Sequence, residues 1–263
     1  MAKTIVVPLD GSDAAARALP AATWLAEKLD ADVRLLVTSF GADVAEEEAY
    51  LASQAASTGL VHISSAVLRK VFPPRGIVEA VDALPDGVLC MTTRGRGAVA
   101  EFLLGSVSDA VLREATAPIV LVGPACDPVE AQTSKEMVVA VDGSAGSLEA
   151  VTTAATWARE LHLDVHLVTV EPPGLPEDVY DPARSKALTA GAAILDAAGV
   201  AVERHVLASK HPADSLVAFT VGLHAALVAI GTHGHGLGGA ALGHVALQVV
   251  RHSPCPVLTR RTT

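Results

Sequence analysis

The stretch Ile5-Val-Val-Pro-Leu-Asp10-Gly-Ser12 recurs in the second half of the chain as Met137-Val-Val-Ala-Val-Asp142-Gly-Ser144. Each copy is a short apolar run that ends in Asp-Gly-Ser, a sequence typical of a turn followed by a helix start. The echo continues downstream, where Leu104-Gly105 matches Leu242-Gly243. A repeat of this length predicts two similar domains, each about half of the chain.

Apolar runs rich in valine, isoleucine and leucine alternate with segments of helical period throughout each copy. Strands that are apolar on both faces indicate parallel sheets covered by helices on each side. The predicted fold is α/β, with two tandem Rossmann-like domains over residues 1–124 and 135–263, each a five-stranded parallel sheet between helices. The stretch 123–134 is rich in proline, glycine and small polar residues, and residues 125–134 are predicted to be a linker. The first copy is expected to have strands near 4–9, 33–38, 61–68, 87–91 and 118–122, with helices near 13–29, 44–58, 76–84 and 106–115; the second, strands near 137–141, 165–170, 201–207, 226–231 and 256–259.

Composition and charge exclude several classes of protein. Of the 263 residues, 51% are hydrophobic and only 3% are aromatic, which rules out a disordered chain. The formal net charge of −10 gives no general attraction to nucleic acid or to anionic lipid. The N-terminal apolar run meets Asp10 too early for a signal peptide, so a cytoplasmic protein is expected. The three cysteines form no C-x-x-C pair and are expected to be buried thiols.

The carboxyl ends of two predicted strands carry the residues most suited to hold an anion. One ends in Asp10, and the other leads into Gly95, Gly97 and then Gly105-Ser106, where a helix begins. Glycines allow close approach of the backbone, and free N–H groups at a helix start attract phosphate. Two simpler interpretations remain open: Ser106 heads an S-x-x-D capping pattern, and Asp10-Gly-Ser is also an ordinary turn and cap.

These residues resemble the universal stress protein family, and the two copies are similar to a tandem member. The resemblance covers nearly the whole chain and rests on V-P-L-D-G-S, M-T-T-R-G-R-G, L-L-G-S-V and A-P-I-V-L-V. It implies domains similar to the adenine nucleotide alpha hydrolases and binding of ATP, with or without Mg²⁺. The family's ATP-binding pattern G-x2-G-x9-G-[S/T] matches Gly95, Gly105 and Ser106, while Thr92 stands where its first glycine is expected.

The resemblance implies that Asp10 and Asp142 contact the adenosine side of the nucleotide. The remaining contacts are expected at Pro8, Thr92, Gly95, Gly97, Gly105, Ser106 and Val107 in the first copy and at Gly231, Gly234 and Gly243 in the second. The second copy has eight residues, rather than nine, between Gly234 and Gly243. It also replaces the serine with His244, so the first copy is expected to bind better.

The expected function is a stress-responsive, nucleotide-binding regulator that senses ATP and hydrolyses it slowly at most. The alternative is a member of the family that binds no nucleotide and serves as a scaffold for assembly. The resemblance also implies self-association through the edges of the final strands, either within one chain or between two tandem chains.

Other readings have less support. The fingerprint G-x-G-x-x-[G/A] at Gly95 and at Gly234 follows the fourth strand instead of the first, which disfavours a dinucleotide enzyme. No G-K-[S/T] is present, so no P-loop is predicted. His233, His235, His244 and His252 lack a cysteine or carboxylate at a suitable spacing, so no metal site is predicted there.

Overall fold

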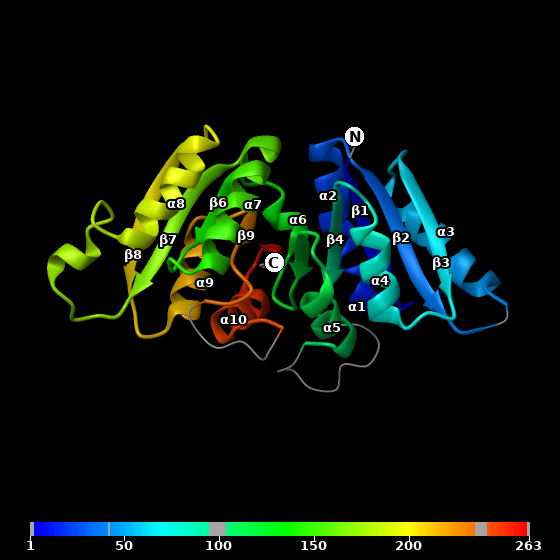
Figure 1. The fold of residues 1–263 in the computed structure, drawn as a ribbon. Helices are drawn as coiled ribbons and strands as arrows, with labels where there is room; N and C mark the ends of the chain where they lie inside the picture. Colours follow the sequence, from blue (N-terminus) through cyan, green and yellow to red (C-terminus); the bar gives the residue numbers. More distant parts are fainter. Residues whose placement is uncertain (1–2, 42, 95–103, 235–240, 262–263) are drawn as a thin grey trace. The chain divides into compact units, whose positions relative to one another are not determined.

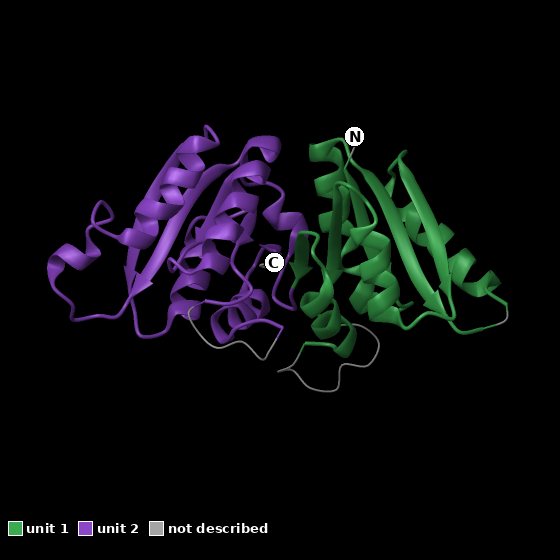
Figure 2. Ribbon diagram, viewed as in Figure 1, with its two compact units in different colours: residues 1–122 green, residues 123–263 purple. Residues whose placement is uncertain are grey.

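A computed structural model describes residues 3–41, 43–94, 104–234 and 241–261. The chain divides into two compact units, Met1–Val122 and Gly123–Thr263 (Figure 2). Each unit contains five parallel strands with helices packed against them (Figure 1). The α/β fold predicted for both halves is therefore confirmed.

The first unit is doubly wound around its own sheet. Its strands lie in the order β3-β2-β1-β4-β5, so the chain moves outward in one direction from β1 and then returns to start again at β4. Helix α2 contacts α3, and α4 contacts α5, as two separate pairs. The elements are β1 (Thr4–Leu9), α1 (Asp13–Ala16), α2 (Leu19–Leu29), β2 (Asp32–Ser39), α3 (Ala45–Thr58), β3 (Ile63–Arg69), α4 (Pro73–Asp82), β4 (Gly87–Thr92), α5 (Ser106–Glu114) and β5 (Ile119–Val122).

The second unit repeats this winding, with the strand order β10-β9-β6-β7-β8. The segment predicted as a linker contains the short helix α6, and the Asp127 N–H donates to the Pro254 carbonyl at 2.8 Å. The elements are α6 (Pro128–Ala131), β6 (Glu136–Ala140), α7 (Ala145–Leu161), β7 (Asp164–Glu171), η1 (Glu177–Tyr180), α8 (Lys186–Ala197), β8 (Val202–Ala208), α9 (Pro212–Gly222), β9 (Leu227–Ala229), α10 (His244–His252) and β10 (Val257–Thr259).

The core of each sheet is made of aliphatic strand residues. Ile5, Val6 and Val7 of β1 are fully buried, as are Met137, Val138 and Val139 at the corresponding places of β6. A strand buried on both faces is the pattern that indicates a parallel sheet between helices. The two quoted stretches are thus central strands, and the turns that follow them lie at the carboxyl ends of their sheets.

One predicted helix of the first unit is wrong. The segment 13–29 forms two helices, α1 and α2, which are separated at Arg17–Ala18. Pro20 lies near the start of α2, and a proline inside a helix clashes with the carbonyl four residues earlier. The second unit has Thr152 at the same distance from its Asp-Gly-Ser turn, and α7 continues unbroken through it.

No helix within the described ranges is both long enough and apolar enough to cross a membrane. The self-association expected through the final strands stays a prediction.

The three cysteines are buried and none of them forms a disulfide, as the sequence predicts. Burial raises the pKa of the Cys90 and Cys255 thiols to about 12. At pH 8 only about one such thiol in ten thousand is a thiolate, the form that reacts with disulfide reagents. We therefore expect Ellman's reagent to label the native chain very slowly and to label three thiols at once in guanidinium. Rapid labelling of Cys90 or Cys255 in the native chain would contradict this burial.

Candidate functional site

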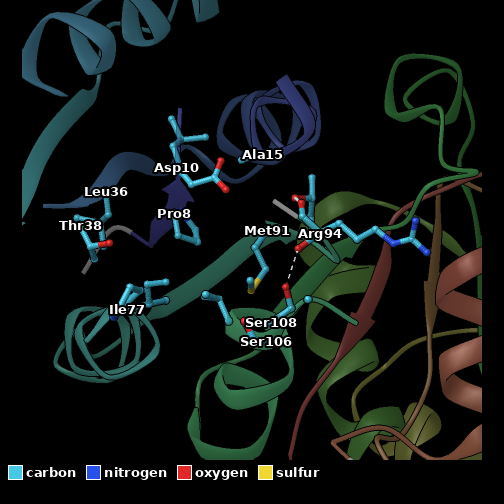
Figure 3. A pocket seen from close by; sticks show the side chains of 15 residues that line it. Pro8, Asp10, Ala15, Leu36, Thr38, Ile77, Met91, Arg94, Ser106 and Ser108 are labelled. Atoms are coloured by element: carbon cyan, nitrogen blue, oxygen red, sulfur yellow. Dashed lines mark hydrogen bonds between the residues drawn. The ribbon is translucent and has the colours of Figure 1, made fainter. Parts of the chain in front are cut away.

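A cavity of about 240 Å³ lies in the first unit where β1 and β4 end, the point at which the winding of the sheet reverses (Figure 3). Open α/β sheets bind their ligands at such a switch point because the two chain crossings leave a crevice there. The cavity is lined by Pro8, Leu9, Asp10, Ala15, Leu36, Thr38, Pro73, Ile77, Met91, Thr92, Arg94, Gly105, Ser106, Val107 and Ser108.

The start of helix α5 forms one side of this cavity. Gly105 is the N-cap, and its own N–H donates to the Thr93 carbonyl at 2.9 Å. The first bond inside the helix runs from the Asp109 N–H to the Gly105 carbonyl, also at 2.9 Å. Helix geometry therefore leaves the N–H groups of residues 106–108 without a carbonyl four residues earlier in the helix. These amides form the positive end of the helix dipole beside the cavity.

The interpretation that Ser106 merely caps its helix is wrong. The cap residue is Gly105, which has no side chain to bond the helix end, and Ser106 is the first helical residue. Its side chain is exposed and lies at the cavity (Figure 3). The Ser106 hydroxyl is thus placed as a donor beside the positive helix end.

Asp10 lies across the cavity from Ser106 (Figure 3). Its Oδ1 accepts hydrogen bonds from the Ser12 N–H at 3.0 Å and from the Ser12 hydroxyl. Ser12 in turn caps α1, because its Oγ accepts from the Ala15 N–H at 3.2 Å. The turn-and-cap interpretation is right for Ser12, and the same bonds fix the direction of the Asp10 carboxylate.

The loop after β4 is braced by two hydroxyl groups. The Thr92 Oγ1 donates to the Arg94 carbonyl at 2.6 Å, and the buried Ser108 Oγ donates to the Thr92 carbonyl at 3.2 Å. The first bond closes the turn after the strand, and the second holds the strand end next to α5. Gly95 and Gly97, which were predicted to contact phosphate, lie outside the described residues.

The opposite wall of the cavity is apolar. Leu36 and Thr38 reach it from β2, Ile77 from α4 and Met91 from β4. None of these residues was predicted from the sequence, because Leu36 comes beside Pro8 only through the pairing of β1 with β2. A wall of this kind suits a flat apolar group, whereas the Asp10 and α5 side suits polar and anionic groups.

The second unit differs at the corresponding place. A Cβ added to Gly234 would lie 2.3 Å from the Asp142 Oδ2, so the loop backbone lies directly against this carboxylate. A Cβ on Gly231 would lie 2.9 Å from the Gly146 carbonyl at the start of α7. Gly243 caps α10 and its N–H donates to the Thr232 carbonyl at 2.7 Å, as Gly105 does in the first unit. The helix start is preserved, and the loop backbone at Gly234 lies against one side of the Asp142 carboxylate, which is otherwise exposed.

Three comparisons with known proteins point to the same family. The universal stress protein family model matches residues 37–123 and 133–261. Universal stress protein Slr1230 of Synechocystis is 26% identical, over 98% of this chain and 100% of its own length. A universal stress protein of Thermus aquaticus, encoded in the QAH/OAS sulfhydrylase 3′ region, is 35% identical over 46% of this chain and 99% of its own length. A crystal structure of a universal stress protein from Archaeoglobus fulgidus has a similar fold, with a TM-score of 0.68, 20% identity and coverage of 98% of both chains.

Proposed function

The chain belongs to the universal stress protein family as a tandem member, and from this premise we propose that its first unit binds an adenine nucleotide. The observation that carries the proposal is the pairing of Asp10 with the start of α5 across one cavity. The adenosine would occupy the side of Asp10 and the apolar wall. The phosphates would accept from the N–H groups of residues 106–108 and from the Ser106 hydroxyl.

The charges of the cavity support an anionic ligand on one side only. The helix dipole places about half a positive charge at the start of α5. The Asp10 carboxylate, held by Ser12, would repel phosphate but accept from ribose hydroxyls. This polarity orients the nucleotide with its ribose toward β1 and its phosphates toward α5.

We propose a sensor that binds ATP rather than an enzyme that consumes it. The bonds from Ser12 occupy Oδ1 of Asp10, which favours a fixed acceptor over a base that activates water. A sensor responds to the binding of ATP without consuming it. ATP that binds only the folded state stabilises that state.

The proposed site belongs mainly to the first unit. In the second unit the loop backbone at Gly234 lies against Asp142, which leaves less room for adenosine on that side of the carboxylate. The exposed His244 also replaces the serine hydroxyl at the start of α10. These features favour a scaffold role for the second unit, which is the alternative function for the chain as a whole.

The nucleotide content of the purified protein distinguishes the sensor function from the scaffold function. Freshly purified protein is denatured and removed, and the supernatant is analysed for nucleotide by ion-exchange chromatography. The sensor proposal predicts an adenine nucleotide, or binding of added ATP by the emptied protein that is at least tenfold weaker in Asp10→Ala. Asp142→Ala is the matched control and is expected to bind like the wild type. A chain that carries no nucleotide and binds no added ATP would contradict the sensor proposal and support the scaffold function.

A further inference from the structure

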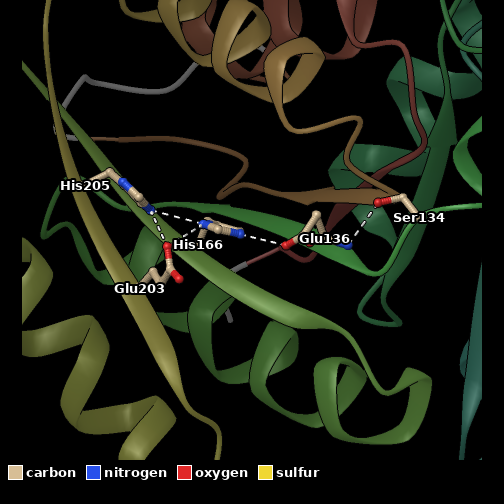
Figure 4. A network of polar contacts seen from close by, with 5 residues as sticks. All are labelled: Ser134, Glu136, His166, Glu203 and His205. Carbon is tan, nitrogen blue, oxygen red and sulfur yellow. Dashed lines mark hydrogen bonds and ion pairs between the residues drawn. The ribbon is translucent and has the colours of Figure 1, made fainter.

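Two histidines and a glutamate meet on the sheet of the second unit, within the first four residues of their strands (Figure 4). His166 lies on β7, and Glu203 and His205 lie on the neighbouring β8. The strand register pairs His166 with Glu203 and Val168 with His205, so the three side chains share one face. This cluster lies toward the opposite strand ends from the Asp-Gly-Ser turn of the same unit.

The three possible ligand atoms are close together. His166 Nδ1 is 3.0 Å from His205 Nε2, while Glu203 Oε2 is 3.6 Å from the first nitrogen and 3.8 Å from the second. A point equidistant from the three atoms lies about 2.0 Å from each, within the range of Zn–N and Zn–O bonds. The side chains thus already have the spacing that one ion requires.

A fourth residue orients the most buried histidine. The other ring nitrogen of His166, Nε2, lies 2.7 Å from Glu136 Oε2 at the start of β6 (Figure 4). The Glu136 N–H is itself held by the Ser134 hydroxyl at 3.1 Å. A carboxylate beside Nε2 keeps the proton there and turns the Nδ1 lone pair toward the cluster. Histidine ligands of metals ordinarily have such a carboxylate or carbonyl partner.

From this geometry we propose that His166, His205 and Glu203 bind a divalent transition-metal ion of the zinc class, with Glu136 as the positioning residue for His166. Two imidazoles and one carboxylate are a ligand set of zinc proteins, and three protein ligands leave a position for water. Mg²⁺ and Ca²⁺ prefer all-oxygen ligands and are not expected here.

Burial and ring packing agree with a metal role. The side chain of His166 is 9% exposed and that of Glu203 is 73% exposed, so the cluster has a fixed base and an open entrance. The Phe219 ring of α9 lies 4.9 Å from the His205 ring and 6.2 Å from the His166 ring, which restricts both imidazoles.

The first unit provides an internal comparison. Arg34 occupies the place of His166, because it lies two residues after Asp32 as His166 lies two after Asp164. Its strand partner is Ser64, whereas His166 pairs with Glu203. The place of His205 is taken by Ala66. The donor set is therefore confined to the second copy of the repeat and does not follow from the shared fold.

The test uses the full chain, freed of metal with a chelator and titrated with Zn²⁺ in competition with a chromophoric chelator. We expect one tight site per chain and no competition from excess Mg²⁺. Glu203→Gln, on an exposed side chain, and His205→Ala are each expected to weaken this site at least a hundredfold. Glu136→Gln is expected to weaken it by about 10–100-fold, as for other residues that orient a metal ligand. The visible spectrum with Co²⁺ in place of Zn²⁺ reports the mixed nitrogen and oxygen ligands.

Matched variants separate this site from the other histidines. The double variant His233→Ala/His244→Ala is expected to keep the affinity of the wild type. Circular dichroism of each variant without metal checks the fold, and Glu203→Gln keeps the test valid if His205→Ala fails to fold. Absence of stoichiometric zinc binding, or tight binding that survives Glu203→Gln and follows His233 and His244 instead, would overturn the proposal.

Discussion

Replacement of Gly105 by arginine is expected to abolish the stabilisation of the chain by ATP. For the wild type, ATP at a hundredfold excess over its Kd stabilises the folded state by about 2.7 kcal/mol. This corresponds to a rise in Tm of roughly 10 °C for a unit of this size. Gly105 caps α5 and lines the cavity, so a long side chain there fills the space that the phosphates need. The measurement is a thermal melt with and without millimolar ATP.

The controls for this substitution come from the chain itself. A Cβ on Gly105 would lie 3.4 Å from its nearest neighbour, the Thr93 carbonyl oxygen, which is ordinary contact, so Gly105→Ala is expected to fold. Gly243 has the same surroundings in the second unit, with 3.4 Å to the Thr232 carbonyl oxygen. Gly243→Arg is therefore expected to keep the full ATP shift. If Gly243→Arg loses the ATP shift and Gly105→Arg retains it, the nucleotide binds in the second unit, and the proposal is contradicted.

Replacement of Thr152 by proline is expected to cost about 3 kcal/mol of unfolding free energy or more. Thr152 lies in the interior of α7, on its exposed face, and its Oγ1 donates to the Leu148 carbonyl at 3.1 Å. Proline removes the backbone N–H at this position, and its ring clashes with that carbonyl. The helix would break at the place where Pro20 divides its counterpart in the first unit.

Urea denaturation followed by far-UV circular dichroism measures this cost. Thr152→Ala is the matched control, since alanine at an exposed helix position is expected to change the stability by less than about 0.5 kcal/mol. Equal stabilities of the proline and alanine variants would show that the second unit tolerates the break as the first does.

Much of the fold could be predicted because its determinants are local. The buried strands beginning at Ile5 and Met137 are marked by continuous apolar runs, and the repeat fixes their equivalence. The break between α1 and α2 was missed although Pro20 signalled it, because the apolar period runs through the proline. The apolar pattern predicts one continuous helix there, whereas the proline ring is incompatible with one, and the helix is divided.

The site residues divide in the same way. Asp10 and Ser106 could be located from the sequence because they directly follow or begin a regular element. Leu36 and Ile77 enter the cavity only through the packing of β2 and α4 around it. The cluster of His166 with His205 depends on the register between β7 and β8, and the sequence of neither strand alone specifies that register. Likewise, the approach of Gly234 to Asp142 joins residues far apart in the sequence, and the sequence pattern does not predict it.

The proposed nucleotide site depends on the start of α5, which would provide backbone amides to the phosphates. An NMR titration of the ¹⁵N-labelled chain observes these amides directly. On addition of ATP, the amide signals of Ser106, Val107 and Ser108 are expected to shift strongly, and adenosine alone is expected to shift them much less. If ATP binds while these three signals stay in place, or if the shifts are confined to the start of α10, the account is contradicted.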